Sequence, residues 1–257
     1  MTIDRHIAEN RRRWDEVAAD WVAAGERSWA RLEPQWGIWG VPEAELELLP
    51  ESMHGMKAVE LGCGTGYVSA WMARRGAEVT GIDLSEQQLA TARRLAGEHG
   101  VSVELVQGNA EATPFADGQF DFAISEYGAA IWCDPYSWIP EAHRLLKPGG
   151  RLVFLGHHPL AAVCATEDGG STGERLVNPY FGMHMQDWTQ AEIDPGGIEF
   201  NLPISEWFAL FRKTGFAVED YLEPRPASPD EGKEFAQPAS WAYRFPGEQV
   251  WKLRKVS

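Results

Sequence analysis

The 257-residue chain carries 23 Lys and Arg residues against 38 Asp and Glu residues, which gives a formal net charge of −15 at pH 7. Because phosphate backbones are bound by basic surfaces, this charge argues against a nucleic-acid partner. No apolar run approaches the roughly 20 residues of a membrane span, and no signal-peptide pattern opens the chain, so we expect no membrane association. The three cysteines form no CxxC pair or metal-ligand spacing, which predicts no metal site and a reducing, cytoplasmic location.

The first predicted element is an amphipathic helix over residues 3–24, in which Ile7, Trp14, Ala18 and Trp21 recur at three- and four-residue spacing. Further tryptophans follow between residues 35 and 40, and a short helix is predicted over residues 42–49. We expect residues 1–50 to form a helical cover and residues 51–257 to form the main domain.

The stretch from residue 58 to residue 83 predicts a strand, a glycine turn, a helix and a second strand. The turn places Gly62, Gly64 and Gly66 at alternate positions, and the second strand ends in Asp83. Glycine tolerates positive φ and lets a ligand approach bare backbone. An acid at the tip of the second strand can accept hydrogen bonds from both hydroxyls of a ribose. The stretch therefore predicts a nucleotide-binding βαβ unit.

The spacing of the turn indicates which nucleotide it suits. Dinucleotide folds carry G-x-G-x-x-G, whereas this chain has E-x-G-x-G-x-G with Glu60 ahead of the first glycine. A carboxylate beside the turn would repel a pyrophosphate but suits a ligand that carries positive charge. A nicotinamide-dependent oxidoreductase is therefore the weaker alternative.

Later elements continue the alternation of strands and helices. Ser85 is predicted to cap a helix with Gln88 near its start, and further strands are predicted over residues 101–107, 122–125 and 151–156. Residues 157–201 are rich in glycine and proline and poor in helix signals, so we expect an insertion that covers the substrate site. Ser205 is predicted to cap a helix over residues 206–214, and strands are predicted over 216–222 and 250–256.

These motifs resemble those of the class I S-adenosylmethionine (SAM)-dependent methyltransferases that act on small molecules, of the methyltransferase type 11-like family. The turn from Glu60 to Gly66 resembles their motif I, and Gly81 to Ser85 the acidic motif that follows. The segments 108–115 and 141–150 resemble two later motifs, and Trp14-Asp15-x-x-Ala18 resembles the family's N-terminal opening. The resemblance implies an α/β, Rossmann-like three-layer sandwich with a seven-stranded, mostly parallel sheet and an antiparallel last strand.

The resemblance also implies the residues that bind the cofactor. Asp83 and Gln88 would hold the ribose, Asn109 and Ala110 the adenine, and the Gly62 carbonyl the ammonium. Asn109 stands where the family usually has an aspartate. The full set of expected SAM-binding residues is Trp14, Trp36, Glu60, Gly62, Cys63, Gly64, Asp83, Leu84, Gln88, Asn109, Ala110, Glu111 and Ser125.

Catalysis in such a site depends mainly on alignment, because the methyl group of a sulfonium is already activated. A general base is required only where the acceptor must lose a proton. The candidates are His157, His158 and Tyr127, with His184 as a further possibility; alternatively, one of the paired histidines caps backbone and the other is exposed. Many of the twelve tryptophans could roof a pocket for a flat or lipophilic molecule, or they could attach the cover to the core.

We therefore predict a SAM-dependent methyltransferase that methylates a small molecule, releases S-adenosylhomocysteine, and is a monomer or homodimer. A non-catalytic module that binds SAM or its product is an alternative. A nucleic-acid methyltransferase is opposed by the net charge and by the tip of the fourth strand, where Ser125-Glu126-Tyr127-Gly128 stands instead of an N/D-P-P-Y/F motif.

Overall fold

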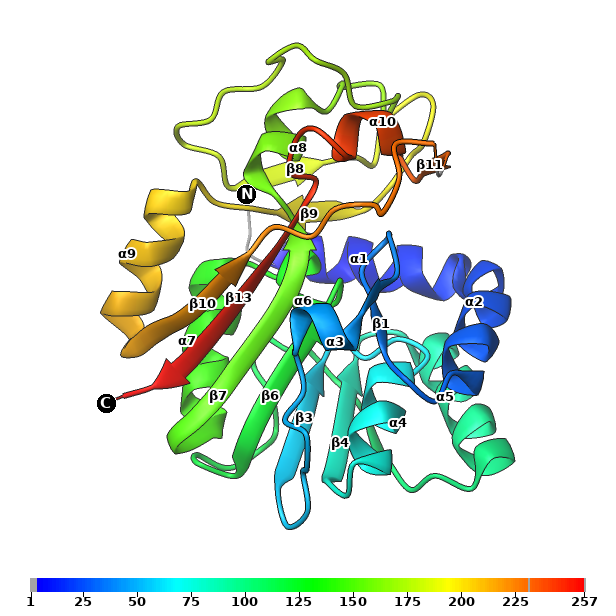
Figure 1. Ribbon diagram of the computed structural model, residues 1–257, viewed down its shortest axis with the longest axis vertical. Helices are drawn as coiled ribbons and strands as arrows, with labels where there is room; N and C mark the ends of the chain where they lie inside the picture. The colour runs from blue at the N-terminus through cyan, green and yellow to red at the C-terminus, as the bar shows by residue number, and fades with distance from the viewer. Residues whose placement is uncertain (1–3, 231, 257) are drawn as a thin grey trace.

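A seven-stranded sheet forms the centre of the computed structural model, which describes residues 4–230 and 232–256. The strand order is β10-β13-β7-β6-β3-β4-β5 (Figure 1). β13 is antiparallel to both of its neighbours, and the other pairs are parallel, which confirms the predicted sheet and its antiparallel last strand. The strands are β3 (Lys57–Leu61), β4 (Glu78–Asp83), β5 (Glu104–Gln107), β6 (Phe120–Glu126), β7 (Leu146–His157), β10 (Phe216–Leu222) and β13 (Glu248–Lys255).

The central strands are apolar on both faces because helices cover both faces of the sheet. In β7, Leu152 and Phe154 pack in one apolar cluster, whereas Val153 and Leu155 pack in another. The first cluster contains the buried side of α7 (Pro135–Leu145) and α9 (Ile204–Thr214), and the second contains that of α4 (Tyr67–Arg74). These layers are the three-layer sandwich that the sequence predicts.

The N-terminal segment forms two helices rather than the single helix predicted over residues 3–24. Helix α1 (Asp4–Glu16) ends before Val17 and α2 (Ala18–Ala30) begins after it, while residue 3 lies outside the described residues. The break lets α1 run above the sheet while α2 turns down beside α5 (Glu86–His99), and both helices contact α5 (Figure 1). In α2, the buried Trp29 donates its Nε1–H to the Thr65 carbonyl at 2.7 Å. A domain boundary near residue 50 stays a prediction.

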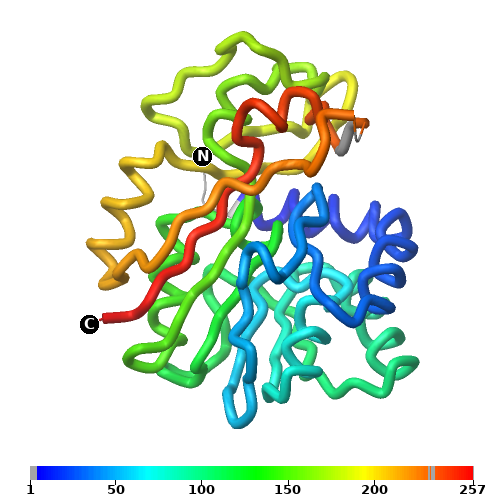
Figure 2. The backbone as a smooth tube through the Cα atoms, viewed as in Figure 1, coloured from blue at the N-terminus to red at the C-terminus, as the bar shows by residue number. Residues whose placement is uncertain are grey.

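Several short elements surround the carboxyl ends of the parallel strands. The insertion after β7 contains α8 and the β8–β9 hairpin, and these elements lie above the sheet beside α10 (Figures 1 and 2). The predicted helix over residues 42–49 is confined to α3, and Pro203 rather than Ser205 caps α9, without a side-chain hydrogen bond. The short elements are β1 (Gln35–Trp36), β2 (Val41–Pro42), α3 (Glu43–Leu46), α6 (Ala129–Trp132), α8 (Pro159–Cys164), β8 (Met185–Asp187), β9 (Ile198–Phe200), β11 (Lys233–Glu234), β12 (Gln237–Pro238) and α10 (Ala239–Ala242). Within the described part of the chain, no helix is both long and apolar enough to cross a lipid bilayer.

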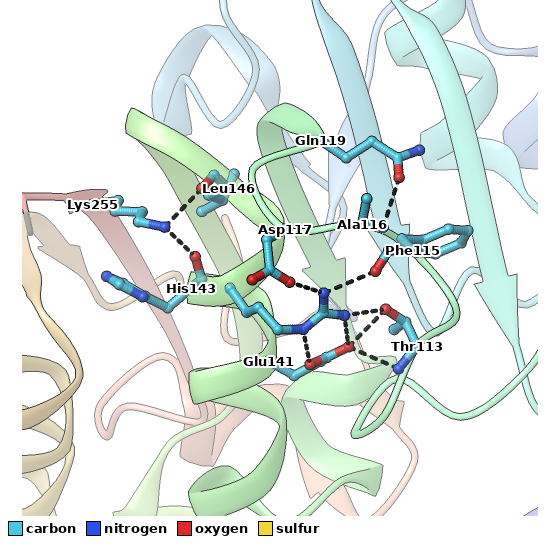
Figure 3. Close-up of polar contacts among 10 residues, drawn as sticks. Thr113, Phe115, Ala116, Asp117, Gln119, Glu141, His143, Leu146 and Lys255 are labelled. Carbon is cyan, nitrogen blue, oxygen red and sulfur yellow. Dashed lines mark hydrogen bonds and ion pairs between the residues drawn. The ribbon is translucent and has the colours of Figure 1, made fainter.

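The end of α7 is fastened to the turn that precedes β6 by a polar cluster (Figure 3). Arg144 donates to Glu141 at 2.7 Å and to Asp117 at 2.6 Å, and Glu141 accepts the Thr113 backbone N–H at 2.7 Å. Lys255 of β13 donates to two carbonyls at the end of this helix, at 2.8 and 2.9 Å. Part of the segment 141–150, one of the motifs noted in the sequence, therefore stabilises the fold.

The turns that follow β3 and β6 approach each other backbone to backbone. Gly62 has a φ of 77°, and a Cβ at this position would lie 2.6 Å from the Gly128 Cα and 2.7 Å from the Ala129 nitrogen. A Cβ on Gly128 would lie 2.2 Å from the Gly62 carbonyl oxygen. Neither contact can be relieved by rotating a side chain, so both positions require glycine.

Gly62→Ala is expected to destabilise the fold by more than about 2 kcal/mol, because it adds a backbone clash to an unfavourable positive φ. Gly97→Ala is the matched control, since Gly97 lies in α5 and its Cβ would meet nothing within 4 Å. The control is expected to be neutral or to stabilise by up to about 1 kcal/mol. Urea unfolding of both variants tests this, and a Gly62→Ala protein as stable as wild type would contradict the close approach.

Candidate active site

A cavity of about 450 Å³ lies at the carboxyl ends of the parallel strands. Its floor includes the turns after β3 and β6, where the strand order changes direction. Open α/β sheets bind ligands at this switch point. α1, α2 and the β8–β9 hairpin supply its other walls, so the N-terminal cover and the insertion both face the same cavity.

The glycine turn is bound directly to the acid at the tip of β4. The Gly64 N–H donates to Asp83 Oδ2 at 2.7 Å, and the Ser85 N–H donates to Asp83 Oδ1 at 2.9 Å. Burial raises the pKa of Asp83, although these backbone hydrogen bonds act in the opposite direction. Each carboxylate oxygen can accept a further hydrogen bond, and Asp83 lines the cavity, so it can still accept from a ligand.

Glu60 binds the start of α4, the helix that follows the same turn. Its Oε2 accepts the Ser69 N–H at 2.7 Å and also the Ser69 hydroxyl, so the side chain satisfies a free N–H in the first turn of α4. Burial raises the pKa of Glu60 to about 8. Glu60 therefore serves the helix start, and it also lies on the cavity wall.

Most of the residues predicted to bind the cofactor line this cavity. They come from the helix α1, the glycine turn, the tip of β4, the start of α5 and the segment after β5. These residues are Trp14, Glu60, Gly62, Cys63, Gly64, Asp83, Leu84, Gln88 and Ala110.

Two of the predicted cofactor residues lie in the core instead of on the cavity wall. Trp36 is fully buried and donates its Nε1–H to Glu43 at 2.6 Å; its neighbours Gly37 and Ile38 line the cavity in its place. Ser125 is also buried, and its hydroxyl donates to the Leu61 carbonyl at 2.7 Å. Both side chains are therefore used within the core, and a contact of either residue with the cofactor stays a prediction.

Asn109 and Glu111 are likewise absent from the cavity wall because both side chains hold backbone. The Glu111 N–H donates to Asn109 Oδ1 at 2.9 Å, which shapes the turn that presents Ala110 to the cavity. Glu111 Oε1 lies 2.6 Å from His6 Nε2 and accepts the Asp134 N–H at 2.7 Å. In this structure, these two side chains can affect a ligand beside Ala110 only through the backbone that they hold.

Two buried carboxyl groups that the sequence analysis did not single out hold the loop of Gly37 and Ile38. Glu126 accepts the Gly37 N–H at 3.0 Å and the Tyr67 hydroxyl. Glu248 Oε1 accepts the Ile38 N–H at 2.9 Å and the Tyr127 hydroxyl at 2.9 Å. Burial raises the pKa of Glu126, and it raises that of Glu248 to about 8. The position of Glu126 at the tip of a strand can indicate a site residue in the sequence. The position of Glu248 within β13 gives no such indication.

The histidines predicted as bases are in different environments. His157 lines the cavity, its Nδ1 lies 3.3 Å from Gln237 Nε2, and its ring contacts the Tyr127 ring edge-on at 5.0 Å. Burial lowers the pKa of His157 to about 4, which keeps the ring neutral near pH 7. Tyr127 also lines the cavity. These two side chains are therefore the predicted bases that reach the site.

The other two histidines do not line the cavity. His158 Nδ1 accepts the Leu160 N–H at 2.9 Å and caps α8, as the alternative reading of the pair allowed. Burial lowers its pKa to about 4 as well. His184 lies 2.9 Å from Asp134. The structure therefore assigns His158 a structural contact and leaves His184 outside the cavity.

Aromatic side chains form part of the cavity wall. The Trp14 ring lies 5.5 Å from Trp21 and 5.2 Å from Trp132, between ring centroids. Trp188 of the insertion lines the same cavity, whereas Trp138 is fully buried in the core. Some tryptophans therefore line the cavity and others pack in the core, so both predicted roles occur.

A glycine turn bonded to an acid at the neighbouring strand tip defines a nucleotide-type site in a Rossmann-like sheet. Comparison with known proteins indicates which family of nucleotide-binding proteins this chain resembles. Residues 59–154 match the family model described as a methyltransferase domain. The matched segment is thus similar to a methyltransferase domain, and SAM is the cofactor that such a domain of the SAM-dependent class implies.

Individual relatives agree with this assignment. The chain is 46% identical over 102 residues to a ubiquinone biosynthesis O-methyltransferase of Pseudomonas aeruginosa, covering 39% of this chain and 44% of that protein. It is 40% identical over 168 residues to the enzyme of that name from Ruegeria pomeroyi, covering 65% and 62% respectively. The aligned region thus spans less than two thirds of these relatives. A SAM-dependent methyltransferase structure from Mesorhizobium loti is 25% identical, with a TM-score of 0.65, over 85% of this chain and all of that chain.

The chemistry of the cavity fits this cofactor. SAM carries an ammonium and a sulfonium and no phosphate, and five carboxyl side chains line the cavity, from Glu60, Asp83, Glu126, Asp194 and Glu199. Among the described lining residues, Arg13 is the one Lys or Arg. The volume also lies within the usual range of ligand sites, roughly 300–1,000 Å³.

The raised pKa of Glu248 predicts a pH-dependent stability. Its pKa rises from an ordinary 4.5 to about 8 in the fold, so the folded state favours the protonated acid. The stabilisation is complete below about pH 4.5 and is lost as the pH rises through about 8. Glu248→Gln, which mimics the protonated form, should therefore gain stability relative to wild type across this window, by at most roughly 4 kcal/mol.

Urea unfolding at about pH 5 and about pH 8.5 measures this difference. Glu45→Gln is the matched control, because Glu45 is exposed, and its stability difference from wild type should not vary with pH. A Glu248→Gln variant whose difference from wild type is the same at both pH values would show that Glu248 is ionised in the fold.

Proposed function

We propose that this protein transfers the methyl group of SAM to a small-molecule acceptor. The observation that carries the proposal is one cavity that joins the Gly62–Gly64 turn and Asp83 to Tyr127 and His157. A cofactor bound at the turn and an acceptor beside the histidine would share this space.

In this proposal, Asp83 and Gln88 hold the ribose hydroxyls of the cofactor. Asp83 is fixed by two backbone N–H groups, and Gln88 is buried in the first turn of α5, so both side chains are positioned before a ligand binds. The Gly62 carbonyl and the carboxyl-lined floor face the ammonium end, and Ala110 faces the adenine. Trp14 covers the ligand from α1.

The bound cofactor would supply an activated methyl group for in-line displacement by the acceptor. The protein then has to orient the acceptor and exclude water. His157 is neutral near pH 7 and lies on the cavity wall, so its ring can accept a proton from an acceptor that must lose one. The Tyr127 hydroxyl is held by Glu248 and can orient a polar group of the acceptor.

Location and assembly remain proposals. The three cysteines are free and buried, in keeping with a reducing, cytoplasmic location. A monomer or homodimer is what we propose for the state of the protein in solution.

Asp83→Asn is expected to weaken the binding of SAM and of S-adenosylhomocysteine alike by about tenfold or more, because the ribose hydroxyls lose a charged acceptor. Isothermal titration calorimetry measures both affinities. Asp121→Asn is the control: Asp121 also accepts a backbone N–H, from Lys57 at 2.9 Å, but lies at the opposite end of the sheet. Equal affinity in wild type and Asp83→Asn would refute the ribose assignment, and no affinity in wild type would refute the function.

His157→Gln is expected to reduce turnover at least about tenfold with an acceptor that must be deprotonated, and to leave SAM affinity unchanged. His158→Gln should affect the cap of α8, and hence stability, more than turnover. The assay is release of S-adenosylhomocysteine with a panel of aromatic alcohols and amines. Full turnover of His157→Gln with a hydroxyl acceptor would exclude His157 as the base.

A further inference from the structure

The β8–β9 hairpin presents two carboxylates to the cavity, Asp194 from the loop between its strands and Glu199 from β9. In β9, Ile198 and Phe200 are buried, whereas Glu199 is half-buried. Glu199 and its neighbour Phe200 both line the cavity, so the carboxylate of Glu199 lies on the cavity wall beside an aromatic ring.

The strand that carries Glu199 is fixed on both sides of this residue. The Ile198 N–H donates to Asn10 Oδ1 at 2.7 Å, and Asn10 Nδ2 donates to the Ile198 carbonyl at 2.8 Å. On the other side, Asn201 Nδ2 donates to the His157 carbonyl at 2.8 Å. Glu199 is therefore held in a defined position, near the end of β7 where the proposed acceptor lies.

The surroundings of Glu199 leave room for a positive partner. The Trp188 side chain donates a hydrogen bond to the carboxylate, and the neighbouring charge is another acid, Asp194. Burial raises the pKa of Glu199 to about 7. Desolvating an ionised carboxylate is unfavourable unless a cation accompanies it, so a cationic ligand would be stabilised here.

Three of the other four cavity carboxyls, Glu60, Asp83 and Glu126, already have several partners within the protein, and the fourth, Asp194, is exposed to solvent. Glu60 accepts from Ser69, Asp83 accepts two backbone N–H groups, and Glu126 accepts from Gly37 and Tyr67. All three lie at or beside the turns that form the proposed cofactor end, whereas Glu199 belongs to the insertion. The aromatic rings near it can pack against an apolar body and favour a cation through their faces.

We propose that Glu199 binds a positively charged amine group of the methyl acceptor, so that the substrate class is an amine with an apolar or aromatic body. This inference rests on the proposed function. In this proposal, the insertion recognises the acceptor and the glycine turn recognises the cofactor.

The test compares 2-phenylethylamine, which is cationic at pH 7.5, with its neutral analogue 2-phenylethanol. Binding of each is measured by NMR titration of the full chain, with and without saturating S-adenosylhomocysteine. Wild type is expected to bind the amine about tenfold or more tightly than the alcohol, because only the amine forms a charge-assisted hydrogen bond. In Glu199→Gln the preference should fall to within about threefold, and Glu199→Asp should keep part of it.

Glu192→Gln is the matched control, because Glu192 lies in the same insertion, is exposed, and does not line the cavity. It should keep the preference of wild type. Three results would overturn the inference: no detectable amine binding in wild type, equal binding of amine and alcohol, or a preference that persists in Glu199→Gln.

The affinity for S-adenosylhomocysteine, measured on the same samples, separates this inference from the proposed function. It is expected to be the same in wild type and Glu199→Gln. A selective loss in the variant would assign Glu199 to the cofactor and overturn the acceptor role. If wild type binds the amine selectively but not S-adenosylhomocysteine, the proposed function fails while the amine site stands.

Discussion

The site depends on the backbone contact between the turns after β3 and β6. The chain continues from β3 into one half of the sheet and from β6 into the other half. The crevice between them exists because Gly62 and Gly128 have no side chains, and their backbones approach to distances that a Cβ would not permit. Everything placed around the cavity is positioned relative to this contact.

Buried carboxyl groups then fix the parts that surround the contact. Glu60 holds the start of α4, Asp83 holds the glycine turn, and Glu126 and Glu248 hold the loop of Gly37 and Ile38. Each one satisfies backbone N–H groups that regular secondary structure leaves unpaired. The acidity of the site is thus partly a requirement of its architecture, and a cationic cofactor is compatible with it.

The sheet could be predicted from the sequence because its signals are local. Apolar runs, the alternate glycines and Asp83 at a strand tip each report on a few neighbouring residues. The same holds for Ser85, whose hydroxyl accepts the Gln88 N–H at 3.1 Å as predicted. Local signals do not distinguish a side chain that faces a ligand from one that holds backbone, and the side chains of Ser125, Asn109 and Glu111 hold backbone.

The remaining differences between expectation and structure concern contacts that are made only in the folded chain. Trp36 is an aromatic residue of the type that can cover a ligand, but its indole N–H donates a hydrogen bond to Glu43 within the core. Glu199 lies in an insertion without a regular pattern, and its position depends on Asn10, 189 residues earlier, through the neighbouring Ile198. Such pairings are properties of the tertiary structure and leave no periodic trace in the sequence.

Asn10 has a further consequence for how the cavity exchanges its contents. Its single amide binds the Trp132 carbonyl of α6 at 3.0 Å and both backbone groups of Ile198 in β9, while its own backbone belongs to α1. The N-terminal helix and the hairpin are therefore mechanically coupled, although about 190 residues separate them in the chain. Arg5 of α1 and Asp187 of β8 form a second link, an ion pair at 2.8 Å, so a ligand that leaves between these two walls must separate them at both contacts.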